Sequence, residues 1–176
     1  MKRLLWTSFA LLLLATAAQT QEIPDADVAA GYAHFHIIKG FTIPTDGASG
    51  SVAWNANDWL GVAGDAGVYH GYPGTGLNVA TYTFGPRVSY RKANWVTPFA
   101  QALVGRAHFS SAVGGVPNST GGHFAFALGS GIDIALSRSG KFALRPEGEY
   151  FGWRANGSTV NNVRLGIGLV YRIGRR

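Results

Sequence analysis

Large apolar side chains alternate with small or polar ones, residue by residue, over long stretches of the chain. In the last such stretch Leu165, Ile167 and Leu169 stand on one side and Gly166 and Gly168 on the other. Because successive side chains of a strand point to opposite faces, this alternation predicts strands with two unlike surfaces. It is regular in residues 79–91, 123–136, 142–153 and 162–173, and weaker in residues 28–37, 51–55, 59–70 and 96–109. We therefore expect eight strands.

The composition limits what these strands can build. Charged residues make up 14% of the chain, below the ~25% of ordinary soluble domains, and 25 residues are glycine. The uncharged stretch 107–132 is broken by glycine, proline and asparagine, so we do not expect a membrane-spanning helix there. Only helices and closed barrels satisfy every backbone polar group inside lipid. The sequence predicts an all-β fold, an eight-stranded antiparallel up-and-down transmembrane β-barrel.

The two predicted faces differ in a way that favours a membrane barrel over a soluble one. One face is large and aromatic, whereas the other is mostly glycine and alanine with sparse charges. Small residues suit the narrow interior of an eight-stranded barrel, and a water-exposed face would carry many more lysines and glutamates. A soluble exported barrel or sandwich is the less favoured alternative. Aromatic residues near the segment ends fit interfacial girdles; they are Trp54, Trp59, Tyr90, Trp95 and Tyr171.

The connecting segments provide a second signal, because long and short connections alternate along the chain. The long ones, rich in turn-forming residues, are expected at 38–50, 71–78, 110–122 and 154–161. The short ones are expected at 56–58, 92–95 and 137–141. Outer-membrane barrels combine long external loops with short periplasmic turns and keep both termini inside. We therefore expect four external loops.

Residues 1–20 have the features of a signal peptide. Basic residues precede an apolar stretch from Phe9 to Leu14, and Ala15-Thr16-Ala17 supplies a small-residue cleavage site, whose position we give only approximately. Residues 21–176 are expected to form one outer-membrane β-barrel domain. The chain contains no cysteine, so this domain folds without disulfides. Its formal net charge of +6 before cleavage is not gathered in one segment, which gives nucleic-acid binding little support.

The stretches 84–91 (FGPRVSYR), 97–102 (TPFAQA), 131–134 (GIDI) and 164–171 (RLGIGLVY) resemble the OmpA/OmpX-type outer-membrane β-barrel domain family. The resemblance covers the whole mature chain and rests on pattern more than on invariant residues. It implies a location in the bacterial outer membrane. It also implies that the last strand carries the signal for the barrel-assembly machinery. The chain departs from many members in ending on Gly174-Arg175-Arg176 rather than on an aromatic residue.

His108 and Ser110 form the His-x-Ser pair that some eight-stranded outer-membrane lipid A deacylases carry. A nucleophile and its base need a third group that orients the base. No aspartate or glutamate occurs between Asp65 and Asp133, so no nearby loop supplies an acid. A lipid-modifying enzyme is therefore the weaker alternative, and we expect no enzymatic activity and no catalytic residue.

Four histidines are expected at external strand ends, and imidazoles can bind zinc or copper. The alternation does not fix the facing of His36 and His108, and it places His70 outward. With His123 as the fourth, convergence on one ion is not indicated. We therefore expect no metal site and no cofactor.

The main functional hypothesis concerns seven charged residues that fall on predicted inward faces. Charges inside a barrel persist when they are paired and hydrogen-bonded. Four acids against three arginines, or four with Arg91 or Arg106, are close to balance, which predicts a structural cluster that closes the lumen, with a proton or small-solute path as the alternative. The residues are Asp65, Arg87, Asp133, Arg145, Glu147, Glu149 and Arg164.

If the lumen is closed, we expect the external side of the barrel to carry the function. We predict a small integral outer-membrane protein with a structural or interaction role through four external loops, and the alternative is a narrow pore for very small solutes. The expected partners are outer-membrane lipid and lipopolysaccharide, the barrel-assembly machinery during biogenesis, and an extracellular ligand of the loops, where specificity is expected to lie. We expect a monomer.

Overall fold

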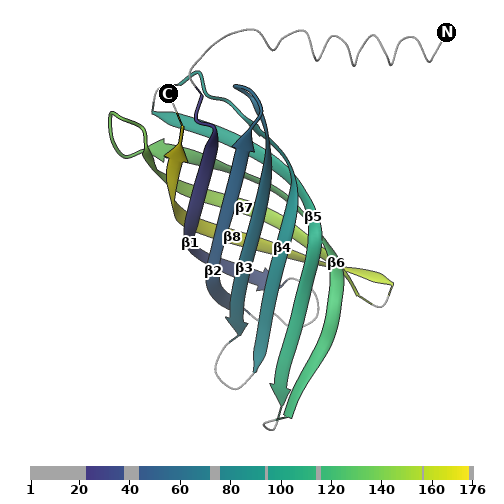
Figure 1. Cartoon of the computed structure of the whole chain (residues 1–176). Helices are drawn as coiled ribbons and strands as arrows, with labels where there is room; N and C mark the ends of the chain where they lie inside the picture. The colour runs from purple at the N-terminus through teal and green to yellow at the C-terminus, as the bar shows by residue number, and fades with distance from the viewer. Residues whose placement is uncertain are drawn as a thin grey trace, which may run out of the picture.

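The computed structural model describes residues 23–37, 44–71, 76–93, 95–113, 116–155 and 157–174, and the expected signal peptide lies outside them. These residues form eight strands of one sheet (Figure 1). The strands are β1 Ala26–Ile37, β2 Pro44–Asn55, β3 Leu60–Gly71, β4 Leu77–Ser89, β5 Val96–Val113, β6 Val116–Ala135, β7 Phe142–Ala155 and β8 Ser158–Ile173.

Each strand pairs with the next in antiparallel fashion, and β1 pairs with β8 to close the barrel. This closing seam runs from Ala26 opposite Ile173 to Ile37 opposite Asn162. The predicted eight-stranded antiparallel up-and-down barrel is confirmed. In the part of the chain that the structure describes, no helix is long and apolar enough to cross a membrane. Since β1 begins and β8 ends at the same end, we call the opposite end the external end, following the topology of outer-membrane barrels.

The outer wall of the barrel is apolar and the inner wall is small or charged. In β8, Leu165 and Leu169 are 57% and 58% exposed on the outside, whereas Arg164, which precedes Leu165, is buried inside. Phe84 of β4 and Leu128 of β6 are exposed in the same way. The faces predicted for β3, β4, β6, β7 and β8 are therefore confirmed. An exposed apolar wall of this extent is suited to lipid rather than water.

Strands β1, β2 and β5, whose facing the sequence did not assign, follow the same alternation. In β1, Phe35 is buried inside while Tyr32 is exposed outside. In β5, Phe99 and Leu103 point into the lumen, where most other strands place small or charged residues. Because large side chains occur on both faces of β1 and β5, apolarity alone did not identify the inner face.

The prediction of long external loops is wrong for much of three of them. Residues 44–50 belong to β2. Residues 110–122 are expected to be a loop, but β5 extends to Val113 and β6 begins at Val116. Residues 154–161 are also expected to be a loop, but Ala155 pairs with Ser158. Long and short connections therefore do not alternate as predicted.

The sequence contains the signal that would have predicted these hairpins. Gly114-Gly115 and Asn156-Gly157 are dipeptides typical of two-residue hairpin turns. Gly157 has a φ of +77°, a conformation that glycine adopts without strain. Composition alone predicts a loop for the polar residues 110–122, but strands that lie outside the membrane can be polar on both faces.

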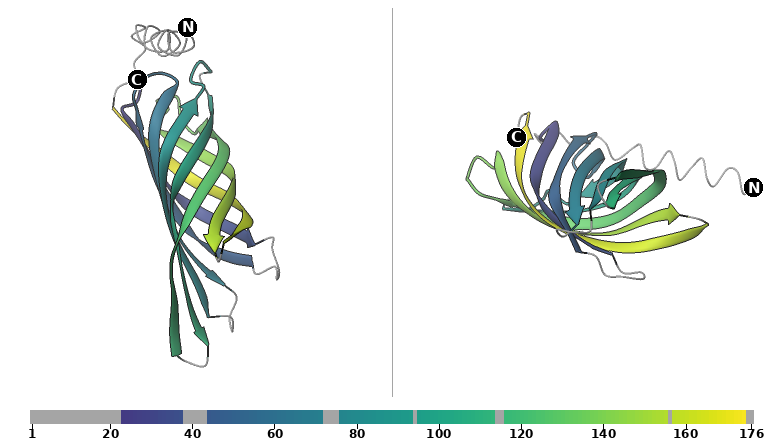
Figure 2. Two further views of the ribbon diagram at one scale, coloured as in Figure 1. Left: turned by 90° about the vertical axis from the view of Figure 1, so that its right-hand side faces the viewer. Right: turned by 90° about the horizontal axis from the view of Figure 1, so that it is seen from below.

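The β5–β6 hairpin extends beyond the rest of the barrel at the external end (Figures 1 and 2). Its register shifts between Ala107 and Phe109, so that Gly121 and Gly122 of β6 lie opposite His108 alone. Such a β-bulge bends a hairpin and increases its twist. On its other side β6 pairs with β7 only from Ala125 onward, and no described strand pairs with that edge of residues 116–124.

Arginine on the outer wall tests the assigned register and depth. Leu128→Arg places a guanidinium in the middle of the apolar wall and is expected to lower the free energy of unfolding by ~2–4 kcal/mol. Leu136→Arg, on the same face just past the periplasmic end of β6, is the matched control and is expected to cost about 0–1 kcal/mol, because the penalty falls near the interface. Urea unfolding in lipid vesicles measures both values. Equal costs would contradict the assigned depth.

Candidate functional site: the lumen

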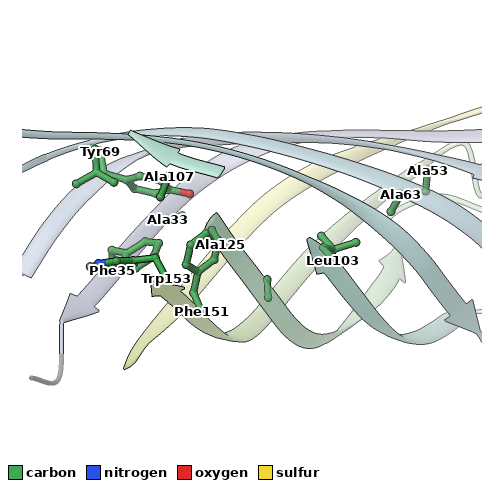
Figure 3. Close-up of a cluster of buried hydrophobic side chains, with 12 residues drawn as sticks. Ala33, Phe35, Ala53, Ala63, Tyr69, Leu103, Ala107, Ala125, Phe151 and Trp153 are labelled. Atoms are coloured by element: carbon green, nitrogen blue, oxygen red, sulfur yellow. The ribbon is translucent and has the colours of Figure 1, made fainter. Parts of the chain in front are cut away.

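Aromatic rings from four strands fill the external end of the lumen, and Figure 3 shows those of Phe35, Tyr69, Phe151 and Trp153. The ring centroid of Phe35 lies 5.1 Å from that of Tyr69 and 5.2 Å from that of Phe151. The centroids of Phe109 and Trp153 are 4.7 Å apart. These distances are typical of packed aromatic pairs, which are stabilised beyond the area that they bury. We call these five residues the aromatic cap.

Below the cap, Arg164 of β8 is the centre of a network that crosses the lumen. Its guanidinium lies 2.7 Å from the Asp65 carboxylate of β3 and 2.5 Å from that of Glu149 in β7. It also donates a hydrogen bond of 2.8 Å to the hydroxyl of Tyr69. The amide of Gln101 in β5 donates to the second oxygen of Glu149 at 2.5 Å. Arg164 therefore holds β3, β7 and β8 together from the inside.

A second network surrounds Arg145 of β7. Two of its nitrogens donate to the two oxygens of Asp133, at 2.6 and 2.9 Å, and the third donates to Ser51 at 3.2 Å. Such a bidentate pair is the strong form of an arginine–carboxylate contact. The guanidinium carbon of Arg145 also lies 4.8 Å from the ring centroid of Phe99, on which Arg87 packs at 4.3 Å.

A third network lies at the periplasmic end, and of its residues the sequence offered only Arg91, as one of two candidates for a fourth lumen arginine. The other candidate, Arg106, faces outward. Arg91 donates to Asp27 at 3.0 Å and to Asn55 at 2.8 Å. Arg172 lies 3.7 Å from both Asp27 and Asp133, which links this network to that of Arg145. Arg91 and Arg172 do fall on inward faces that alternation predicts. Asp27 lies in β1, whose facing alternation did not assign, so the acid that joins them was missed.

The structure brings six of the seven predicted lumen residues into contact with a polar partner. Arg87 differs from expectation because its partner is the side-chain oxygen of Gln101, at 2.8 Å, and not a carboxylate. Glu147 is the exception, since it forms no hydrogen bond or ion pair with the residues that the structure describes. It borders a cavity of about 10 Å³ together with Ser51, Asp65 and Arg145. A cavity of this size holds roughly one water molecule.

The charges in the described part of the lumen balance. Asp27 joins the four predicted acids, and Arg91 and Arg172 join the three predicted arginines, which makes five residues of each sign. A buried charge without a partner is costly, so neutrality is a condition for filling a lumen with ionised groups. The arginines are also shielded from solvent: Arg87 and Arg145 are 2% exposed and Arg164 is 1% exposed. A water-filled channel would expose them.

The His-x-Ser pair lies outside the lumen. His108 and Ser110 are exposed on the outer face of β5 at the external end. The imidazole of His108 stacks on the ring of Tyr82, with centroids 5.6 Å apart, and its Nε2 lies 3.3 Å from the Tyr82 hydroxyl. The contact that orients this histidine is thus with a phenol, where a catalytic triad would place a carboxylate.

The other histidines of the external end point in different directions. His36 and His70 are exposed on the outer wall, whereas His123 packs against the ring of Phe109 on the inside. Within the described ranges, no three histidine or acidic side chains come together as a metal would require.

The fold is that of small outer-membrane barrels of known structure. Neisserial surface protein A (NspA) has a TM-score of 0.73 at 17% identity, with 85% of this chain and 97% of that chain covered. Ail, the attachment invasion locus protein of Yersinia pestis, has a TM-score of 0.58 at 17% identity, with 85% and 99% covered. The outer membrane enzyme PagL has a TM-score of 0.53 at 18% identity, with 84% and 99% covered. No protein-family model and no curated protein matches the sequence.

At these identities the similarity establishes the fold and not the activity. Combined with the apolar outer wall, this fold places the protein in the bacterial outer membrane. PagL is an enzyme, so the fold by itself does not decide whether such a barrel is catalytic.

Breaking the Arg164 network tests whether the ion pairs hold the barrel together. Arg164→Met strands two buried carboxylates and is expected to lower the free energy of unfolding by ~3–5 kcal/mol. Glu149→Gln combined with Arg164→Met should cost less than the sum of the single changes, by about 0.5–3 kcal/mol. Urea unfolding in detergent micelles gives the four free energies of this double-mutant cycle.

Glu147→Gln is the matched control, because it makes the same chemical change two residues away on the same face of β7 without breaking an ion pair. Its coupling energy with Arg164→Met is expected to be smaller than that between Glu149→Gln and Arg164→Met. Additive effects for Glu149 and Arg164, or equal coupling for both glutamates, would contradict the network described above.

Proposed function

We propose that this protein is a sealed outer-membrane barrel that neither conducts solutes nor catalyses a reaction, and that acts through its external end. The observation that carries the proposal is the filling of the lumen from the aromatic cap, through Arg164 and Arg145, to Arg172 at the periplasmic end. An eight-stranded barrel has just enough room for its own side chains. Paired charged side chains that fill this room support a plug rather than a path for small solutes.

The β5–β6 hairpin is the part of the external end best suited to contact a partner. It projects beyond its neighbours, and residues 116–124 of β6 have a partner strand on one side only within the described residues (Figure 2). A strand edge with unpaired backbone groups is a template for an extended segment of another chain. The proposed role is therefore interaction through this hairpin more than through four equivalent loops.

A lipid-modifying activity receives less support. His108 contacts Tyr82 and has no carboxylate partner among the described residues, and Ser110 and His108 are both exposed. A serine nucleophile needs an oriented base to be activated. We therefore propose that the protein is not an enzyme.

The remaining partners follow from the location. Outer-membrane lipid and lipopolysaccharide surround the apolar wall, and the barrel-assembly machinery inserts the chain. A barrel in this membrane does not meet nucleic acid. The networks of Arg164 and Arg145 are completed within one chain, which supports a monomer.

The plug hypothesis predicts an absence of ion conduction. In planar lipid bilayers the refolded wild-type protein is expected to show no steady conductance, because the buried arginines and the aromatic cap leave no hydrated path. Phe151→Ala combined with Arg164→Ala removes a ring and a guanidinium and is expected to give openings that the wild type lacks. Stable, ion-selective openings of the wild type would end the plug hypothesis and favour the narrow pore.

The interaction hypothesis predicts that the β5–β6 hairpin contacts a specific partner protein. A Cβ added at Gly121 has no heavy atom within 4 Å, so a photo-crosslinking residue fits there. On whole cells, irradiation is expected to give a discrete protein adduct at position 121. The same residue at Ser139, in the periplasmic turn between β6 and β7, is the control and should not give that adduct. The same products at both positions, or none at 121, would speak against the hairpin as the contact surface.

A further inference from the structure

A hollow lies where the β5–β6 hairpin meets the external ends of β3 and β4, and its lining includes the apolar residues Val68, Tyr69, Val79 and Phe109. Its volume is about 550 Å³. Small residues, Ala80 of β4 and Gly122 of β6, are part of its lining. Four polar side chains that point outward also line it: His70 of β3, Asn78 of β4, and His108 and Ser110 of β5.

The strands that form this hollow carry a positive charge beside it, and the outward-facing acid of the neighbouring strand, Asp46 of β2, lies opposite His70 and contacts His34 and Tyr32. Arg106 precedes His108 on the same outward face of β5, and it forms no ion pair with any residue that the structure describes. No aspartate or glutamate occurs anywhere between Asp65 and Asp133. The strands that form the hollow therefore bring guanidinium, imidazole, amide and hydroxyl groups to this surface without a carboxylate.

The hollow begins at the step where the outer wall changes from apolar to polar. Phe84 and Val104 face each other on β4 and β5 and are 62% and 45% exposed on the outer wall. The next outward-facing pair toward the external end is Tyr82 and Arg106. A guanidinium on the lipid side costs little near the interface and much more at mid-depth. We therefore expect Arg106, one outward-facing pair beyond Phe84 and Val104, to lie at the level of the lipid headgroups.

His108 is held in position before any ligand arrives. Its ring stacks on Tyr82 at an interplanar angle of 25°. A Cβ added at Gly122 would lie 2.6 Å from the imidazole, so a residue without a side chain is needed there. The β-bulge opposite His108 thus makes room for the ring and leaves the hollow open beside it.

We propose that this hollow binds a phosphate group of an outer-leaflet glycolipid, that is, of lipopolysaccharide. Arg106 supplies the positive charge, and His108, Asn78 and Ser110 donate hydrogen bonds to the phosphate oxygens. Charge-assisted bonds of this kind are the strongest that a protein surface offers to an anion. The acyl chains of the same lipid then lie along the apolar wall at Phe84 and Val104, which a free anion does not use. This site is separate from the β6 edge of the proposed interaction role.

Native mass spectrometry of the intact barrel in detergent, titrated with lipid A that carries two phosphates, tests this proposal. Arg106→Gln with His108→Gln is expected to weaken binding by about tenfold or more. Arg154→Gln, which removes an exposed arginine from the external end of β7, is the matched control and should leave binding unchanged. The heat-dependent shift in gel migration confirms that each variant is folded, and Arg106→Gln alone replaces the double variant if that one does not fold.

Two further arms identify the ligand chemistry. Lipid A without phosphates is expected to bind the wild type as weakly as intact lipid A binds the double variant. Inorganic phosphate in excess should leave the lipid bound. Wild-type affinity in the double variant, equal weakening by Arg154→Gln, or displacement of the lipid by phosphate alone would overturn the proposal.

Discussion

The rest of the barrel depends on buried arginines that are neutralised by carboxylates of other strands, both neighbouring and across the lumen. Arg164 and Arg145 find their carboxylates on other strands, so the strands must stay in register for the charges to be paired. The glycines provide the space in which these charges lie. A Cβ at Gly129 would lie 2.4 Å from a side-chain carbon of Glu149, and one at Gly67 would lie 2.2 Å from the Tyr69 hydroxyl. Glycine at these two positions is therefore a requirement of the charge cluster.

The external end departs from the regular wall at the β-bulge beside His108. Below the bulge the sheet is a closed cylinder between lipid and a filled lumen, and its backbone groups are paired on both sides. Above it the hairpin leaves the cylinder, one edge of β6 loses its neighbour, and polar side chains reach the surface. A sealed lumen and an open external surface together explain how a barrel without a channel can still recognise other molecules.

Much of this fold could be predicted from the sequence, because a transmembrane barrel must alternate. Leu165, Ile167 and Leu169 identified one wall, and Arg164 identified the other. The facing of a strand could not be predicted where large residues occur on both of its faces. Asp27 of β1 and Phe99 of β5 lie inside on such strands. The prediction of a loop at 110–122 also failed, because it rested on the polar composition of the segment. The dipeptide Gly114-Gly115 in that segment is typical of a hairpin turn. Arg145 pairs with Asp133 and not with Glu147 because of the stagger between the strands. The alternation of side chains predicts which face a residue is on, but it does not predict this stagger.

The central claim is that Arg164 and Arg145 are locked in ion pairs and sealed from water. Nuclear magnetic resonance of the barrel in lipid nanodiscs, observing the arginine side-chain N–H groups, tests it most directly. The account predicts that these two N–H groups exchange with solvent far more slowly than that of the exposed Arg154, and that both give contacts to protons of partner strands. Fast exchange at Arg164 and Arg145, equal to that of Arg154, would mean a hydrated lumen and would contradict the account.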